Sequence, residues 1–171
     1  MSDTISFTQT AGIATLTFNN PQRRNALGAA ELDAIERGLS SLGENARALL
    51  ITSSDDRVFC AGADLTQILD GSLSGDRFQS VTNKIAALPI PSIATLSGNV
   101  FGGGAELALS CDFRLAREDI VLRIPAAAIG LCYPVEGIER ITRRLGPSMA
   151  RRLLVAAETF SAEQMLALGI V

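Results

Sequence analysis

Histidine is absent from the 171-residue chain, and this absence removes several kinds of enzyme chemistry at once. Catalysis by Ser-His-Asp or Cys-His groups, zinc sites with imidazole ligands and histidine acid–base catalysis all need a side chain that the sequence does not have. A serine peptidase is disfavoured for the same reason. Any chemistry must come from carboxylates, tyrosine, lysine, cysteine or backbone dipoles.

Other features are missing as well, and each narrows the possible partners and location. The net charge is −3, so the positive balance of a nucleic-acid-binding domain is lacking. No stretch of about 18 uncharged apolar residues occurs, and Met1 is not followed by a basic region and an apolar run, so we expect neither a membrane span nor a secretory signal. The cysteines are odd in number, widely spaced and form no CxxC, which predicts reduced, partly buried thiols in a cytoplasmic protein. They are Cys60, Cys111 and Cys132.

What the chain does have is the composition of a packed domain. Hydrophobic residues make up 47% and charged residues 19%, the opposite of a disordered chain. Alternating and periodic apolar positions predict strands that alternate with helices, so the expected class is α/β. The expected strands lie at 5–8, 13–18, 48–52, 58–60, 92–96, 112–116 and 121–123. The expected helices lie near 32–42, 65–69, 78–88, 105–110 and 138–145, with a single turn in 125–130, one helix from 146 and one opened by a capping box at 161–164.

Two junctions between a strand, a loop and a helix stand out as places for chemistry. In 59–65 the small residues around Gly62 let a ligand approach the backbone, and Asp64 suits a helix N-cap. In the second, three glycines, Gly102–Gly104, precede a helix whose first N–H groups face outward with roughly half a positive charge. One N–H from each loop can hold a developing oxyanion. Taken singly, each of these features is also explained by a tight turn or close helix packing.

Glu106 adds a possible acid or base to the second junction. It follows Gly103 by three residues, about one helical turn, so the two share a face. A carboxylate there is suited to proton transfer at the carbon next to a polarised carbonyl. The alternative is a first-turn residue that only interacts with the helix dipole.

These motifs together resemble the crotonase superfamily, also called the enoyl-CoA hydratase/isomerase superfamily. The resemblance rests on VFCAGADL at 58–65 and on GNVFGGGAELALSCD at 98–112, and it extends from about Ile5 to Val171. It implies a crotonase-like spiral of ββα turns over 1–171 that binds acyl-CoA thioesters. Family members continue past the position of Val171 with a helical segment that closes the pocket and supports trimers or pairs of trimers, so we expect that segment to be absent or truncated here.

The resemblance also assigns roles to residues. Ala63 and Gly103 would supply the two amide donors of an oxyanion hole, with Glu106 as acid or base. Neither metal nor redox cofactor is implied, because coenzyme A arrives with the substrate; no nucleic acid or membrane partner is expected. The residues that would bind the acyl-CoA are Arg24, Ala26, Leu27, Ala61, Gly62, Ala63, Asp64, Leu65, Gly102 and Gly103.

One departure from the family pattern keeps the reaction open. Hydratases of the family carry a second glutamate directly after the proline that is Pro125 here, and this chain has Ala126. Tyr133 and Glu136 are possible auxiliary groups; a packed tyrosine and a solvated glutamate are the alternatives. Hydration, isomerisation, thioester hydrolysis, decarboxylation and acyl-CoA binding without catalysis therefore all remain possible.

A basic cluster near the end of the chain has two interpretations. The arginines either contact the phosphates of coenzyme A or form a solvated helix face paired with Glu136 and Glu139, and we expect the second. They are Arg140, Arg143, Arg144, Arg151 and Arg152.

Overall fold

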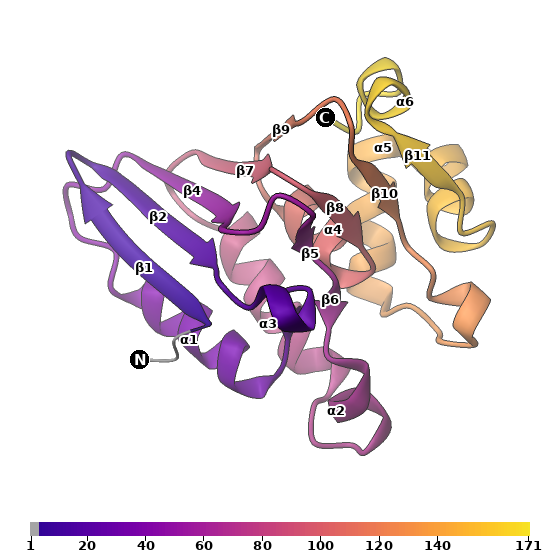
Figure 1. Cartoon of the computed structure of the whole chain (residues 1–171), viewed down its shortest axis with the longest axis horizontal. Coiled ribbons are helices and arrows are strands. Elements are labelled where there is room, and N and C mark those ends of the chain that lie inside the picture. The colour runs from indigo at the N-terminus through magenta and orange to yellow at the C-terminus, as the bar shows by residue number, and fades with distance from the viewer. Residues whose placement is uncertain (1–3) are drawn as a thin grey trace.

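The computed structural model describes residues 4–171, in which two sheets and the helices that follow them form an α/β fold (Figure 1). The first sheet begins with the hairpin of β1 (Ile5–Thr10) and β2 (Ile13–Phe18), whose turn contains Gly12 at a φ of 84°. The parallel strands β4 (Ala48–Ser53), β7 (Ser92–Leu96) and β9 (Phe113–Ala116) complete the order β1-β2-β4-β7-β9.

The second sheet has the order β11-β10-β8-β5. Strands β5 (Val58–Cys60), β8 (Asn99–Phe101) and β10 (Val121–Arg123) run parallel, and β11 (Thr159–Ser161) is antiparallel to β10. Successive strand pairs along the chain, β4 with β5, β7 with β8 and β9 with β10, each give one strand to each sheet and are followed by a helix. This repeated ββα path is the expected crotonase-like spiral.

A short parallel pair of strands forms a third, separate sheet. It consists of β3 (Ala26–Leu27) and β6 (Gly62–Ala63). Asn25, just before β3, is 1% exposed, and its amide nitrogen donates hydrogen bonds of 3.0 Å to the carbonyl oxygens of Val58 and Phe59. This side chain therefore fixes the 24–27 segment against strand β5.

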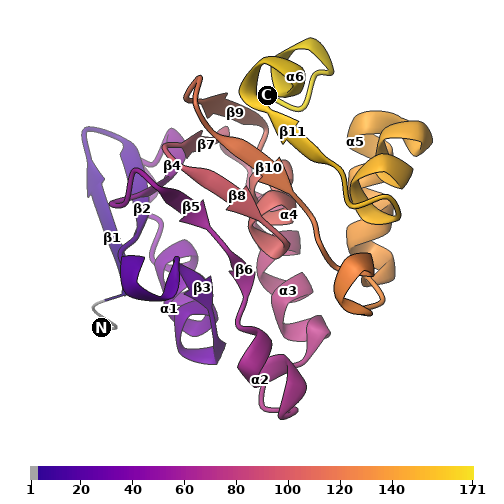
Figure 2. The ribbon, with the colours of Figure 1, turned by 45° about the vertical axis from the view of Figure 1, so that its right-hand side comes forward.

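The helices pack against the sheets and against one another. They are α1 (Ala29–Ser40), α2 (Leu65–Leu69), α3 (Gly75–Ala86), α4 (Gly103–Ser110), α5 (Val135–Leu154) and α6 (Ala162–Ala167), with 3-10 turns η1 (Pro21–Arg23) and η2 (Ala127–Ile129). Helix α4 is buried from Gly104 to Ser110, with Glu106 and Ser110 as its two polar residues, and it contacts both α3 and α5 (Figure 2). The N-terminus of α4 is thus held at the centre of the molecule.

Most predicted elements are confirmed, and the differences have local causes. Helix α1 ends at Ser40 rather than near residue 42, and α4 starts at Gly103 rather than at 105. The two helices predicted at 138–145 and from 146 are confirmed as the two halves of α5, which are separated at Gly146, where a φ of 82° and a ψ of 162° interrupt the helix just before Pro147. Strands β3, β6, β8 and β11 were not predicted: β6 and β8 lie in the glycine-rich junctions, which were interpreted as loops, and β3 and β11 are short segments without an apolar run.

Candidate active site

The two glycine-rich junctions meet in space through direct backbone contact. Gly62 lies against Gly103 so closely that a Cβ atom added at Gly62 would be 2.4 Å from the nitrogen of Gly103. A Cβ at Gly104 would likewise be 2.4 Å from the carbonyl oxygen of Cys60. Real Cβ contacts of this length essentially do not occur, so glycine is required at both positions. This contact brings β6 and the start of α4 together, as the sequence motifs predicted.

Gly103 is the first residue of α4, and this position leaves its N–H outside the hydrogen bonding of the helix. Gly102 precedes it at a φ of 51°, a conformation that favours glycine, and its own N–H donates to the carbonyl of Arg123. The triple glycine therefore combines a left-handed turn, close packing against β5 and β6, and an exposed helix N-terminus.

A cavity of about 310 Å³ opens beside this junction. Segments from β6, α2, α3, α4, η2 and the loop before α5 form its walls. The lining residues are Ala61, Ala63, Leu65, Ile68, Gly75, Phe78, Gln79, Gly102, Gly103, Glu106, Pro125, Ala126, Ile129, Leu131, Cys132, Tyr133 and Pro134. The structure thus brings Ala63, Gly103, Glu106 and Tyr133 to one space.

Glu106 is a buried carboxylic acid in the wall of this cavity, with a side chain that is 1% exposed. The hydroxyl of Tyr133 donates a 2.7 Å hydrogen bond to its Oε2, and the hydroxyl of Thr82 lies 3.5 Å from its Oε1. Nε of Arg140 lies 3.8 Å from Oε1. One carboxyl group is therefore held by groups from α3, from α5 and from the loop before α5.

Burial raises the pKa of Glu106 above its ordinary value, and the neighbouring groups only partly offset this effect. The Tyr133 hydroxyl is the main group that lowers the pKa of Glu106. Burial and the nearby carboxylate raise the pKa of Tyr133 well above its usual range, so the phenol stays protonated as a donor. A carboxyl with a raised pKa that borders a cavity suits proton transfer near neutral pH.

Gly137 allows α5 to approach this carboxyl group. A Cβ at Gly137 would lie 2.6 Å from a ring carbon of Tyr133 and 3.0 Å from both carboxylate oxygens of Glu106. Any larger residue there would displace the tyrosine or the glutamate.

Several predicted site residues do not line the cavity. Asp64 caps α2 through the N–H of Thr66 and forms a 2.7 Å ion pair with Arg23, as its expected N-cap role required. Ala26 and Leu27 pair with β6 and support it from behind, and Arg24 is exposed. Glu136 is exposed and accepts a hydrogen bond from Asn83, so of the two auxiliary candidates only Tyr133 reaches the cavity.

The prediction for the basic cluster was wrong at Arg140. This guanidinium is buried, 8% exposed, and donates to Thr82 and Asn83 beside Glu106 instead of facing solvent. The spacing that places Arg140 one turn after Gly137 and next to the apolar Ile141 was the available signal. Arg144 and Arg152 pair with Asp112 and Glu158 rather than with Glu136 or Glu139. Cys132 is exposed rather than partly buried.

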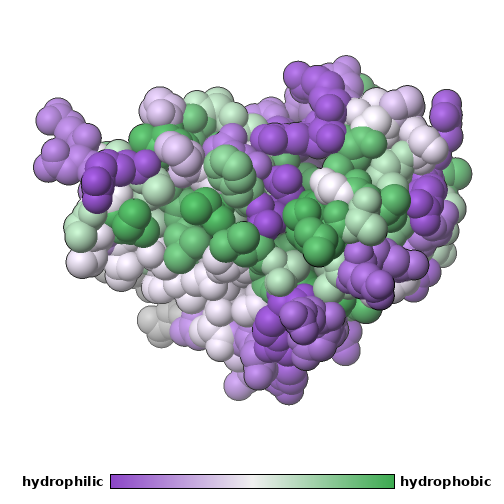
Figure 3. Space-filling view, turned by 90° about the horizontal axis from the view of Figure 1, so that it is seen from above, coloured by the Kyte–Doolittle hydropathy of each residue, from purple (hydrophilic) through white to green (hydrophobic). Residues whose placement is uncertain are grey.

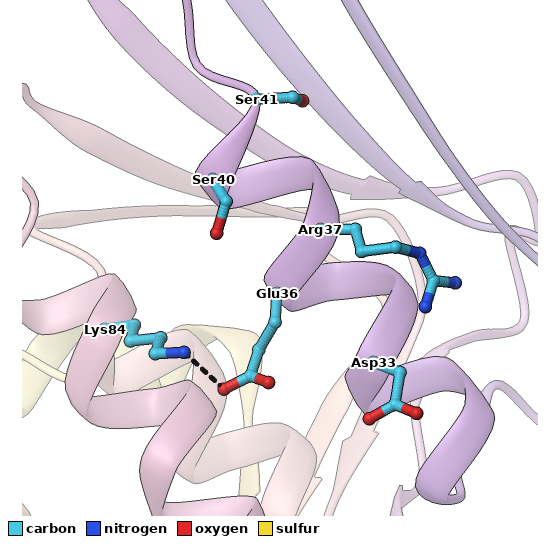
Figure 4. A pocket seen from close by; sticks show the side chains of 6 residues that line it. All are labelled: Asp33, Glu36, Arg37, Ser40, Ser41 and Lys84. Carbon is cyan, nitrogen blue, oxygen red and sulfur yellow. Dashed lines mark hydrogen bonds and ion pairs between the residues drawn. The ribbon is translucent and has the colours of Figure 1, made fainter.

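A second hollow lies on the surface between α1 and α3 (Figure 4). It is lined by charged and hydroxyl side chains, and the Lys84 ammonium forms a 2.6 Å ion pair with Glu36 across it. Asp33 is paired with Arg77 in the same way, and the side chain of Arg37 points away from Glu36 and Lys84, so the charged groups of this hollow do not converge on a common point (Figure 4).

The described part of the chain lacks two further kinds of feature. Within residues 4–171, no helix combines the length and apolar character needed to cross a bilayer. Over the same range, no three His, Cys, Asp or Glu side chains are grouped so that they could hold a metal ion.

Comparison with known proteins gives the same class as the motifs. Residues 8–171 match the family described as enoyl-CoA hydratase/isomerase, and the chain belongs to this family. Enoyl-CoA hydratase domain-containing protein 2, mitochondrial, of Bos taurus is 37% identical over 94% of this chain and 56% of its own length. Crotonyl-CoA hydratase of Syntrophomonas wolfei is 32% identical over 93% of this chain and 64% of its own length.

Solved structures agree with the fold. A crystal structure of enoyl-CoA hydratase from Bacillus anthracis superposes with a TM-score of 0.89 at 27% identity, over 99% of this chain and 69% of that one. This chain therefore spans between about half and about two thirds of the length of these relatives.

Proposed function

We propose that the protein acts on acyl-CoA thioesters by stabilising an enolate, with Glu106 moving the proton. The observation that carries this proposal is the position of the Glu106 carboxyl, buried in the wall of the same cavity that Ala63 and Gly103 line. Family membership supports the choice of thioester.

In the proposed reaction the thioester carbonyl oxygen accepts hydrogen bonds from the backbone N–H groups of Ala63 and Gly103. These bonds stabilise the negative charge that develops when a proton leaves the adjacent carbon, and a donor of this kind contributes about 3 kcal/mol to the transition state. Glu106 takes or returns that proton, which its raised pKa favours at neutral pH.

The coenzyme A portion is assigned by resemblance to the segments around the mouth of the cavity. Ala61, Leu65 and Gly102 line the cavity and fit this assignment. Arg24, Ala26, Leu27, Gly62 and Asp64 are not among the residues that line the cavity, and the proposal assigns them to the path of coenzyme A by resemblance alone.

The exact reaction depends on the wall around Ala126. This residue lines the cavity at the position where hydratases of the family carry a second glutamate, so a water molecule would be oriented by one carboxyl only. Tyr133 supplies a neutral hydroxyl instead. The same observation favours a second candidate function, binding of acyl-CoA without turnover.

Replacement of Glu106 by glutamine tests the proposal. We expect Glu106→Gln to abolish turnover across a panel of CoA thioesters while thioester binding, measured by calorimetry, persists. Glu136→Gln is the matched control, because Glu136 is an exposed glutamate outside the cavity. Full turnover by Glu106→Gln would remove Glu106 from the mechanism, and binding without any turnover by the unmodified chain would favour the second candidate.

Assembly and location belong to the same proposal. The edge strand β9 has two exposed apolar side chains, Phe113 at 60% and Leu115 at 62%, and these support an oligomer. The proposed oligomer is a homotrimer or a pair of trimers, formed when the C-terminal segment is present. Apolar and hydrophilic areas alternate on the face seen in Figure 3. Light scattering tests the assembly.

The proposed location is the cytoplasm, whereas the name of the bovine relative gives a mitochondrial location. Cell fractionation tests one location against the other.

A further inference from the structure

The side-chain amide of Gln79 on α3 is a buried polar group that lacks a hydrogen-bond partner. Gln79 is 3% exposed and lines the cavity. Neither its Nε2 nor its Oε1 makes a hydrogen bond to any of residues 4–171. Buried polar groups are nearly always hydrogen-bonded, and an unpaired one destabilises the fold. An unpaired amide in a cavity wall therefore points to a polar group that enters the cavity.

Gln79 lies beside the proposed acid–base group. Its amide is close enough to Glu106 to lower the pKa of that carboxyl, although the two make no hydrogen bond of good geometry. Thr82, one turn further along α3, is already engaged by Glu106 and Arg140. Gln79 is thus the amide on this helix face that remains available to a ligand.

The position of Glu106 shows which part of an acyl group Gln79 would face. Glu106 follows Gly103 by three residues, which corresponds to about 4.5 Å along the helix. A thioester carbonyl held at Gly103 would place its second and third carbon atoms near Glu106, and Gln79 faces the same region.

The chemistry of the walls selects the kind of substituent. An amide both donates and accepts hydrogen bonds, and a hydroxyl group does the same. Much of the remaining wall is apolar, with Phe78, Ala126 and Ile129, and the nearby Glu106 carboxyl disfavours a second negative charge. A neutral hydroxyl matches these conditions better than an alkyl chain or a carboxylate.

We propose that Gln79 is a specificity-determining residue that hydrogen-bonds a hydroxyl group on the third carbon of the acyl chain. This inference rests on the proposed acyl-CoA function and adds a residue to it. In a chain with Ala126 in place of a second carboxylate, the neutral amide of α3 would hold the substrate oxygen.

Calorimetric binding of two ligands that differ only in this hydroxyl tests the inference. We expect the unmodified chain to bind 3-hydroxybutanoyl-CoA about tenfold more tightly than butanoyl-CoA, and chromatography of the recovered ligand checks that it was not converted. Gln79→Leu should lose that preference while retaining affinity for butanoyl-CoA. Gln79→Met is a second variant with a side chain of similar length. Ser80→Ala is the control, because the Ser80 hydroxyl donates its hydrogen bond to Glu36 on α1 and Ser80 does not line the cavity.

The possible outcomes separate this inference from the proposed function. Equal binding of both ligands by the unmodified chain, or an unchanged preference in Gln79→Leu and Gln79→Met, would overturn the role of Gln79 and leave the thioester proposal standing. If Gln79→Leu were more thermally stable but kept the same preference for the hydroxylated ligand, the buried amide would only destabilise the fold and the role of Gln79 in binding would be overturned. Failure of the unmodified chain to bind either ligand would contradict the acyl-CoA function and the inference with it.

Discussion

The hydroxyl of Tyr133 donates a 2.7 Å hydrogen bond to Oε2 of Glu106, across the gap between the loop before α5 and helix α4. The two residues are 27 positions apart, and the close approach of α5 depends on Gly137, which leaves room for both side chains. The bond joins the only tyrosine of the chain to the carboxyl that we propose as acid or base. Its removal should therefore change the titration of Glu106.

We expect Tyr133→Phe to shift the acid side of the pH–activity profile to higher pH. The hydroxyl lowers the pKa of Glu106, so its loss raises that pKa further, and the ionised base then appears only at higher pH. The measurement is kcat/KM against pH for a turned-over acyl-CoA thioester.

Thr82→Val provides a graded control for this shift. Thr82 makes a longer contact of 3.5 Å with the same carboxyl and contributes least to lowering its pKa, so its profile should move in the same direction by less. An unmoved profile in Tyr133→Phe would mean that Glu106 does not set the acid limb.

The local elements and the two glycine-rich junctions could be predicted from the sequence because each has a near-range signal. The exact bounds of α2, β7 and β10 follow from apolar runs and Gly or Pro boundaries. The network behind Glu106 could not be predicted in the same way. Arg140 and Thr82 are 58 residues apart, and their contact depends on how α3 and α5 pack on α4. The place of Arg140 one turn after Gly137 was the one local signal, and in a basic segment it does not show that the guanidinium is buried against α3.

Substitution of Gly62 by alanine should disrupt the site through a backbone clash. The added methyl would lie 2.4 Å from the nitrogen of Gly103, so either β6 or the start of α4 must shift. A displacement of this size at a proposed oxyanion donor is expected to reduce turnover about 10²-fold, measured as kcat/KM.

Gly71→Ala is the matched control, because Gly71 has a similar positive φ of 78° but open space around its Cβ position. It should cost about 1 kcal/mol of stability and leave turnover intact. Equal losses of activity in the two variants would show that backbone strain, and not the contact with Gly103, decides the outcome.

Loss of Arg140 should destabilise the protein more than loss of its exposed neighbour Arg143. Arg140→Gln removes the cation beside the buried Glu106 and the donor to Thr82, a change that costs about 3 kcal/mol when a buried charge is left without its partner. Arg143→Gln should stay within about 0.5 kcal/mol. Urea unfolding at neutral pH measures both, and equal values would contradict the buried position of Arg140.

Glu106 and Glu36 should affect the pH dependence of stability with opposite signs. The pKa of Glu106 is raised by burial, so the folded state holds its proton more tightly than the unfolded state does, and stability falls as pH rises from about 4.5 through the folded pKa. Relative to the unmodified chain, Glu106→Gln should therefore become more stable as pH rises through that window, and the difference in stability between the two chains should stay constant below it. Glu36 is paired with Arg77 and Lys84, which lower its pKa to about 2. The contribution of Glu36 to stability is present above about pH 4.5 and is lost as pH falls toward 2. Glu36→Gln should therefore be less stable than the unmodified chain at neutral pH and equal to it in strong acid.

Unfolding free energies of the three chains between pH 2 and about 8 test both signs. If the stability of Glu106→Gln relative to the unmodified protein were lower at neutral pH than at about pH 4, the raised pKa of Glu106 would be contradicted.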